Sequence, residues 1–143
     1  PDDGFGNTLI QGQVLATKTV TVSGYDGGNN LINTIPANVD GSFSMGLPAG
    51  THTVIASASG FLPARGTATL VLGETTSMPT IALLAGDIDG NMVIDQFDAM
   101  SIGMNYNTAF PDAADLNADG TINVLDLEAL AANYRASGVQ IWE

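Results

Sequence analysis

The stretch GDIDGNMVIDQFDAMSIGMNY, residues 86–106, decides how the rest of the chain is interpreted, and an altered copy, ADLNADGTINVLDLEALAANY, follows at residues 114–134. In the first copy, oxygen-bearing side chains stand at positions 1, 3, 5, 9 and 12 of a twelve-residue loop. A hard cation takes about six to eight oxygen ligands, which alternating loop residues can supply while the loop wraps around it. This spacing is typical of a calcium loop.

The second loop repeats the pattern 28 residues later, and two copies at a fixed offset argue against a chance match. Position 7 of such a loop contributes a backbone carbonyl and position 12 a carboxylate. The sequence therefore predicts two bound Ca²⁺ ions. The predicted ligands are Asp87, Asp89, Asn91, Val93, Asp95 and Asp98 in the first loop, and Asp115, Asn117, Asp119, Thr121, Asn123 and Asp126 in the second.

The two loops differ at position 6, where the sharp turn favours glycine. The second loop has Gly120 there, whereas the first has Met92. A non-glycine residue held in left-handed geometry costs about 1–2 kcal/mol, so the first loop should be the more strained. The first loop, however, holds four aspartates among its predicted ligands and the second holds three. Which site binds calcium more tightly stays open.

Residues 9–84 have a different pattern, in which short alternating segments are separated by turns rich in glycine and proline. Such alternation predicts β-strands with one buried face, and about seven strands fit this length as a small antiparallel sandwich. The composition changes at Gly86, from rich in Thr, Val, Gly and Ser to rich in Asp, Ala, Asn and Leu. We therefore expect two domains, an all-β sandwich over residues 1–85 and a small all-α domain over residues 86–143.

Each loop runs directly into a helical pattern, over residues 96–106 and 124–135. Helical spacing puts Ala99, Ile102 and Tyr106 on one face and does the same for Leu127, Leu130 and Tyr134, so these faces are the predicted core. The other side is the predicted partner surface, unless it packs on the connection at residues 108–112 or on the β part. Together with loop positions 10 and 11, this surface comprises Gln96, Phe97, Ser101, Met104, Val124, Leu125, Ala129 and Ala132.

The second part resembles the dockerin modules of cellulosome-type assemblies. The matching features are the GDxDGN opening, aspartate at position 12 of both loops, no helix entering the first loop, the duplicated loop–helix unit and the NY that ends both helices. The resemblance implies a calcium-dependent fold that binds a cohesin domain and so attaches its parent protein to a scaffold or cell-surface complex. It also implies that positions 10 and 11 of each loop help to choose the cohesin.

The first part resembles the carboxypeptidase regulatory-like, transthyretin-like sandwiches, on the residues NVDGSFSMGLPAGTHTVIASASGF and the following LGETTSMPTIAL. The two resemblances together imply an X-module–dockerin arrangement. In it the sandwich is a stabilising spacer that packs on or near the dockerin. Such sandwiches are usually appended to secreted proteins and usually carry no catalytic residues.

Composition excludes several function classes. The net charge is −12, with only three lysines and arginines, so nucleic acid and anionic membranes would be repelled. No apolar run is long enough to span a bilayer. The chain has no cysteine, and its only histidine, His52, is predicted to be a surface residue of a strand. Without a catalytic constellation, no enzyme activity is expected, and any catalytic domain would lie upstream.

Two alternatives to a dockerin remain at this level. The chain could be a structural calcium module of an extracellular adhesin or surface protein with no cohesin partner. It could also be a calcium sensor, although sensors open a pair of helices around each loop and here no helix enters the first loop. Calcium loops in a chain without cysteine suit an extracellular setting with millimolar calcium. The apolar tail around Trp142 could fold back near Leu83 and Leu84, pack against the sandwich or remain disordered.

Overall fold

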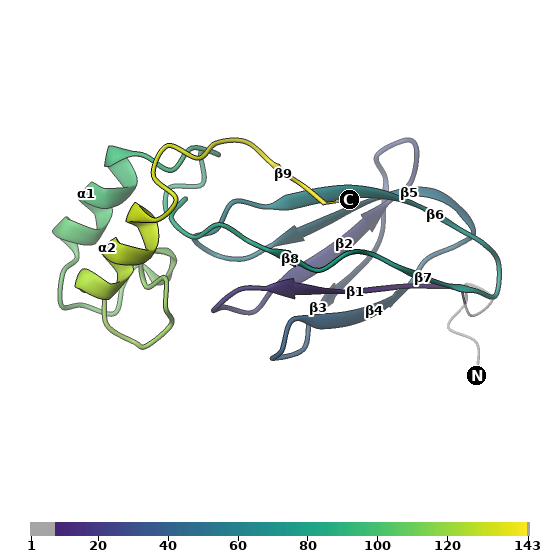
Figure 1. Cartoon of the computed structure of the whole chain (residues 1–143), viewed down its shortest axis with the longest axis horizontal. Coiled ribbons are helices and arrows are strands. Elements are labelled where there is room, and N and C mark those ends of the chain that lie inside the picture. The colour runs from purple at the N-terminus through teal and green to yellow at the C-terminus, as the bar shows by residue number, and fades with distance from the viewer. Residues whose placement is uncertain (1–7, 143) are drawn as a thin grey trace.

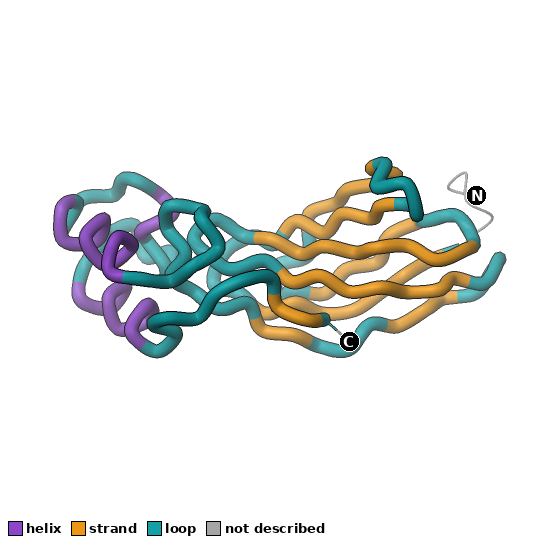
Figure 2. Tube along the Cα trace, turned by 90° about the horizontal axis from the view of Figure 1, so that it is seen from above, coloured by secondary structure: helices purple, strands orange, loops and turns teal. Residues whose placement is uncertain are grey.

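A computed structural model describes residues 8–142, and it shows an elongated β-sandwich with two short helices at one end (Figure 1). After the helices the chain turns back, so that its final strand runs alongside the sandwich (Figure 2). The predicted domain limits at residues 1 and 143 lie outside the described part. Over residues 8–142, no helix is both long and apolar enough to cross a membrane.

The sandwich consists of two mixed sheets. In the first, β1 (Leu9–Leu15) is central and pairs antiparallel with β4 (Ser42–Gly46) and parallel with β7 (Thr75–Ser77) and β8 (Ile81–Ala82). The second has the order β3 (Leu31–Pro36), β2 (Thr21–Tyr25), β5 (Gly50–Ser57), β6 (Ala64–Leu70) and β9 (Gln140–Ile141). All neighbours in the second sheet are antiparallel except β6 and β9.

The alternation that predicted the strands also predicted most of the core between the sheets. The inward residues of β1, β2, β4 and β5 are buried, and they join one apolar cluster. The alternation also predicts an inward position for Leu72, next after Ala68 and Leu70, but Leu72 is 67% exposed because β6 ends at Leu70. The expected surface position of His52 is wrong as well, because His52 is buried on the inward face of β5 with Val54 and Ala56. The His52 Nε2 donates to the Pro48 carbonyl at 2.7 Å.

The predicted fold class, a two-domain chain with an antiparallel sandwich of about seven strands followed by an all-α dockerin, is wrong. The described residues form nine strands in two sheets, three of the strand pairs are parallel, and only two α-helices are present. The decisive element is β9, because it follows the helices in the chain and yet belongs to the second sheet. The last part of the chain is thus built into the sandwich, and a separate helical unit does not describe it.

Trp142 completes the sandwich core. Its side chain is fully buried, its ring packs edge-to-face on Phe43 with centroids 5.6 Å apart, and its Nε1 donates to the Pro79 carbonyl at 2.7 Å. Gly66 makes room for it, since a Cβ there would lie 2.2 Å from the Trp142 carbonyl oxygen. The structure bears out two of the three expectations for this tail. It packs against the sandwich, and it also folds back near Leu83 and Leu84, where the Gln140 side chain accepts from the Leu84 amide at 2.8 Å.

The helices α1 (Gln96–Met104) and α2 (Val124–Ala131) pack around a second apolar cluster at the end of the sandwich. The cluster includes Leu62 from the connection between β5 and β6, so the helical end rests on the sandwich. Ile102 and Leu130 are buried as predicted, whereas Tyr106, Leu127 and Tyr134 are exposed, which corrects half of the predicted core face. A short 3₁₀ helix, η1 (Asp112–Ala114), leads into the second loop.

Candidate metal centre

The end of each acidic loop is fixed by the start of the helix that follows. Asp95 caps α1 by accepting from the Phe97 amide at 3.0 Å, and Asp98 closes a capping box by accepting from the Asp95 amide at 2.9 Å. Asn123 and Asp126 do the same for α2. Because such boxes hold both side chains in place, the carboxylate at position 12 of each loop is oriented by its helix.

Asp98 also reaches back to the beginning of its own loop. Its Oδ1 accepts from the amides of Ile88 and Asp89 at 2.8 and 3.1 Å. One buried carboxylate therefore ties together both ends of the first loop. Asp126 has the same place in the second loop, where its Oδ1 accepts from the Asn117 amide at 3.2 Å.

Both loops bring three carboxylates to one point. One oxygen each from Asp87, Asp89 and Asp98 lies within 4.8 Å of the others, and the same holds for Asp115, Asp119 and Asp126. Two oxygens bound to one calcium at about 2.3–2.6 Å can be at most about 5 Å apart. Each cluster is therefore compact enough for its three carboxylates to share one ion.

The electrostatics of the first cluster also fit a cation. Asp87 and Asp98 are buried, and the Asp87 Oδ1 has no hydrogen-bond partner among the described residues. Burial raises the pKa of both carboxyls, and nearby Asp89 raises each further, against the lowering by backbone amides. Desolvated like charges are unfavourable without a counter-charge. A bound divalent cation would supply that charge and a partner for the Asp87 oxygen.

The remaining predicted ligands lie in these loops but outside the carboxylate clusters. Asn91 and Asn117 accept from backbone amides two residues further along, which tightens the turns. Asp95 and Asn123 serve as helix caps, and position 9 often reaches calcium through a water. The carbonyl ligands expected from Val93 and Thr121 stay predictions.

Position 6 has left-handed backbone geometry in both loops. Met92 has φ 71° and Gly120 has φ 88°. The Met92 amide donates to Asp87 Oδ2 at 3.1 Å, and the Gly120 amide donates to Asp115 Oδ2 at 2.9 Å. The first loop thus makes the expected turn with an unfavourable residue, as the sequence predicted.

The two loop–helix units are interlocked through their backbones. Ile94, in the first loop, donates to the Ala136 carbonyl at 2.8 Å and accepts from the Arg135 amide at 2.7 Å. Ile122, in the second loop, bonds in the equivalent way to Asn107 and Thr108. Each loop therefore pairs with the segment that follows the other unit's helix, and neither unit is complete alone.

The predicted partner surface is largely exposed, so it does not pack on the connection or on the sandwich. Phe97 is 57% exposed, Met104 79% and Leu125 50%. Gln96, Val124 and Ala132 are also exposed, while Ser101 and Ala129 are half-buried. The sequence analysis missed Met100, which is exposed and completes an apolar stripe on α1 with Phe97 and Met104. The helical spacing of Phe97, Met100 and Met104 could have revealed this stripe in the sequence.

The architecture is that of a mixed β-sandwich that carries a duplicated acidic loop–helix unit at one end. The chain belongs to the carboxypeptidase regulatory-like domain family, whose model matches residues 8–84, more than half of the chain. This confirms the resemblance of the first part. No curated protein matches the chain.

Among solved structures, the chain is similar to a chain of a type II cohesin–X-dockerin complex from Acetivibrio cellulolyticus, a mutant at the N-terminal interface, with 20% identity and a TM-score of 0.70. That match covers 91% of this chain and 97% of the other, so a single solved chain accounts for the sandwich and the helical end together. The TIE protein of Bacillus anthracis matches with 11% identity and a TM-score of 0.37, over 52% of this chain and 15% of that protein.

Proposed function

We propose that this chain is a non-catalytic interaction module that binds two Ca²⁺ ions and takes the dockerin role toward a cohesin-type partner. The observation that carries the proposal is the duplication of one loop–helix unit. Each copy gathers three carboxylates within 4.8 Å, and the helix that follows presents apolar side chains to solvent. The similarity in fold to a chain of a cohesin–X-dockerin complex supports an assembly role.

Calcium fits better than other common metals because all the ligands are oxygens. The described residues of both loops hold no histidine or cysteine, which zinc prefers. Residues 86–142 carry nine acids and a single arginine, so two calcium ions would neutralise a large part of the local charge. Binding would fix the loops and thereby the directions of α1 and α2.

The exposed stripes of the two helices are the proposed docking surface. Large apolar side chains at an interface centre commonly provide most of the binding energy. Phe97, Met100 and Met104 would make this contribution on α1, and Val124 and Leu125 on α2. The metal-bound loops would hold these residues in place, and loop positions 10 and 11 would themselves be part of the contact.

The test is binding of the full chain to a panel of cohesin domains, in calcium and in chelator. Phe97→Asp and Leu125→Asp should each weaken binding at least tenfold, about 1.4 kcal/mol, because a charge would be buried in an apolar contact. Val71→Asp is the matched control, since Val71 is equally exposed but lies just after β6 in the sandwich. If the two helix variants and the control bind alike, the proposed surface is wrong.

A second candidate is the cohesin role, in which the sandwich would bind a dockerin. It is favoured by the fact that most of the described chain is sandwich and that the similar solved complex contains both partners. Titration against both cohesin and dockerin domains separates the two. Binding only to dockerins would support this candidate and refute ours, and binding to neither, with calcium bound, would leave a structural module of an adhesin.

The proposed setting is an extracellular or cell-surface complex, such as an assembly that degrades polysaccharides. Calcium at millimolar concentration is available there and would keep both loops loaded. We propose no enzyme activity for the chain. Among residues 8–142 the only groups of three or more acidic, histidine or cysteine side chains close enough to hold a metal ion are those of the two loops, where we propose that the carboxylates bind calcium.

A further inference from the structure

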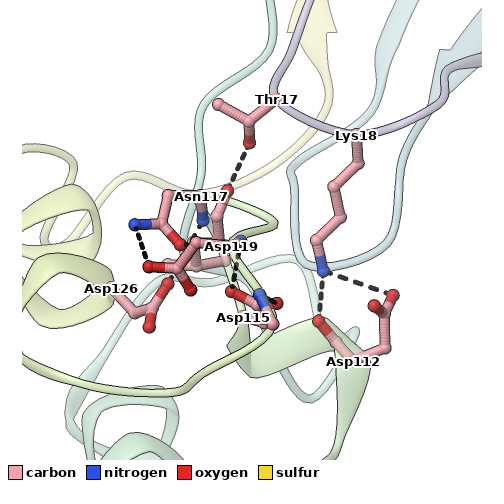
Figure 3. A network of polar contacts seen from close by, with 9 residues as sticks. Thr17, Lys18, Asp112, Asp115, Asn117, Asp119 and Asp126 are labelled. Atoms are coloured by element: carbon pink, nitrogen blue, oxygen red, sulfur yellow. Dashed lines mark hydrogen bonds and ion pairs between the residues drawn. The ribbon is translucent and has the colours of Figure 1, made fainter. Parts of the chain in front are cut away.

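The second loop touches the sandwich at the turn between β1 and β2 (Figure 3). Thr17 donates its hydroxyl to the Leu116 carbonyl, and the Lys18 ammonium donates to the Asp112 carbonyl. The ammonium also lies 3.3 Å from the Asp112 carboxylate. These contacts join residues more than 90 positions apart in the sequence.

The Thr17 contact leads directly to a predicted metal ligand. The Leu116 carbonyl and the Asn117 amide belong to one planar peptide group. The carbonyl end accepts from Thr17, and the amide end donates to Asp126 Oδ1 at 3.2 Å. Thr17 therefore fixes the plane of the peptide that orients the carboxylate at position 12. Leu116 itself is buried, so this peptide has little freedom on its other side.

Two further contacts hold the segment that enters the second loop. The Asp112 carbonyl accepts from both Lys18 and the Asp115 amide, the latter at 3.0 Å, and Asp115 is the ligand at position 1. Gly60, in the turn before β6, has φ 84°, and a Cβ there would lie 2.3 Å from the Ala113 carbonyl oxygen. The sandwich thus approaches this segment as closely as a glycine permits.

The first loop has no equivalent support. The peptide that corresponds to Leu116–Asn117 is Ile88–Asp89, and its amide donates to Asp98 in the same manner. Within residues 8–142, however, no hydrogen bond joins the Ile88 carbonyl to the sandwich. The first loop is instead tied just before its start, where the Gly86 amide donates to the Gly60 carbonyl at 2.8 Å.

We propose that Thr17 is a positioning residue for the second calcium site, and that the sandwich raises the calcium affinity of this site and not of the first. The inference rests on the proposed calcium binding and adds to it an energetic link between the sandwich and one loop. Linkage is reciprocal, so calcium in the second loop also stabilises the turn between β1 and β2.

The test is a calcium titration of the full chain followed by NMR. The amides of Met92 and Gly120 report the two loops separately, because each donates to the position-1 carboxylate of its own loop. Thr17→Val keeps the shape but removes the donor. We expect the Gly120 response to shift to about 3- to 10-fold higher calcium, the effect of losing one hydrogen bond, while the Met92 response is unchanged.

Two further variants serve as controls. Thr17→Ser keeps the hydroxyl and should bind calcium like the unmodified chain. Thr19→Val is the matched control, because Thr19 lies in the same turn, is exposed and makes no hydrogen bond through its side chain among the described residues. Equal weakening of both loops, or no weakening, in Thr17→Val overturns the inference, and so does a loss in Thr17→Ser. If the unmodified chain gives no calcium response, the proposed function itself is wrong.

Discussion

The two loop–helix units have the same spacing of predicted ligands and the same kind of capping box, but they are held in different surroundings. The first unit continues directly from β8 and makes its turn with Met92 at φ 71°. The second makes that turn with Gly120, is buttressed by Thr17 and Lys18, and continues into the strand β9 and Trp142 of the sandwich. Both repeats contact distant parts of the chain, the first through Gly60 and residues 135–136, but the turn between β1 and β2 supports the second.

Because the two copies of the motif lie in different surroundings, we expect them to differ as calcium sites. Ligand spacing is set within twelve residues, so it is copied with the sequence. The capping boxes that orient the carboxylates at position 12 are also present in both copies. Among the described residues, the hydrogen bonds from the turn between β1 and β2 reach the second copy only. Four predictions test this difference, beginning with the largest effect.

Removal of calcium should have the largest effect, because it acts on both units together. At one hundred times the dissociation constant, each site adds about 2.7 kcal/mol to the free energy of unfolding, so two sites add about 5 kcal/mol. Urea unfolding in calcium and in chelator, followed by circular dichroism, measures the difference. We expect the helical signal to be lost first and the strand signal to persist. Identical curves under both conditions would contradict the calcium proposal.

Trp142→Ala tests the attachment of the second unit to the sandwich. Removing a fully buried tryptophan should lower the free energy of unfolding by about 3–5 kcal/mol. Ile141→Ala is the matched control, since Ile141 is the adjacent residue and is 78% exposed. If both variants unfold at the same urea concentration, the tail does not stabilise the sandwich.

The local features of this chain could be predicted from its sequence, and the long-range ones could not. The spacing of acidic residues in the two loops, and the alternation of apolar residues in β1, β4 and β5, both repeat every few residues, so they can be recognised in the sequence. The pairing of β6 with β9 and the Thr17–Leu116 contact join segments with no shared pattern. For this reason the sequence suggested two domains. The sequence held one signal of the contact between the sandwich and the second loop. Lys18 is the only lysine of a strongly acidic chain, so an acidic partner could have been expected for it.

An exchange of the residues at position 3 tests the role of ligand charge. Asp89→Asn should weaken calcium binding in the first loop, and Asn117→Asp should strengthen it in the second, each by about tenfold, or about 1.4 kcal/mol. In Asn117→Asp the amide that donates to Asp119 at 3.2 Å would be replaced by a like charge, so the gain should require bound calcium. The calcium titration described above gives both affinities. If Asp89→Asn strengthened calcium binding and Asn117→Asp weakened it, the charge of the ligands would not set the affinity of these loops.

The smallest effect concerns position 6, where both loops adopt a left-handed φ but only the first does so with a non-glycine residue. Position 4 shows the reverse, with Gly90 at φ 72° in the first loop and Ala118 at φ 57° in the second. Met92→Gly should stabilise the first loop by up to about 1 kcal/mol, because glycine adopts a φ of 71° without a steric penalty. Part of this gain is offset by the greater flexibility of glycine in the unfolded chain. Gly120→Ala should cost a similar amount in the second loop, where a Cβ would meet no other atom and only the φ of 88° opposes it. Calcium titration of both variants measures these changes, and a weaker first site in Met92→Gly would show that the methionine side chain contributes a contact that outweighs its strain.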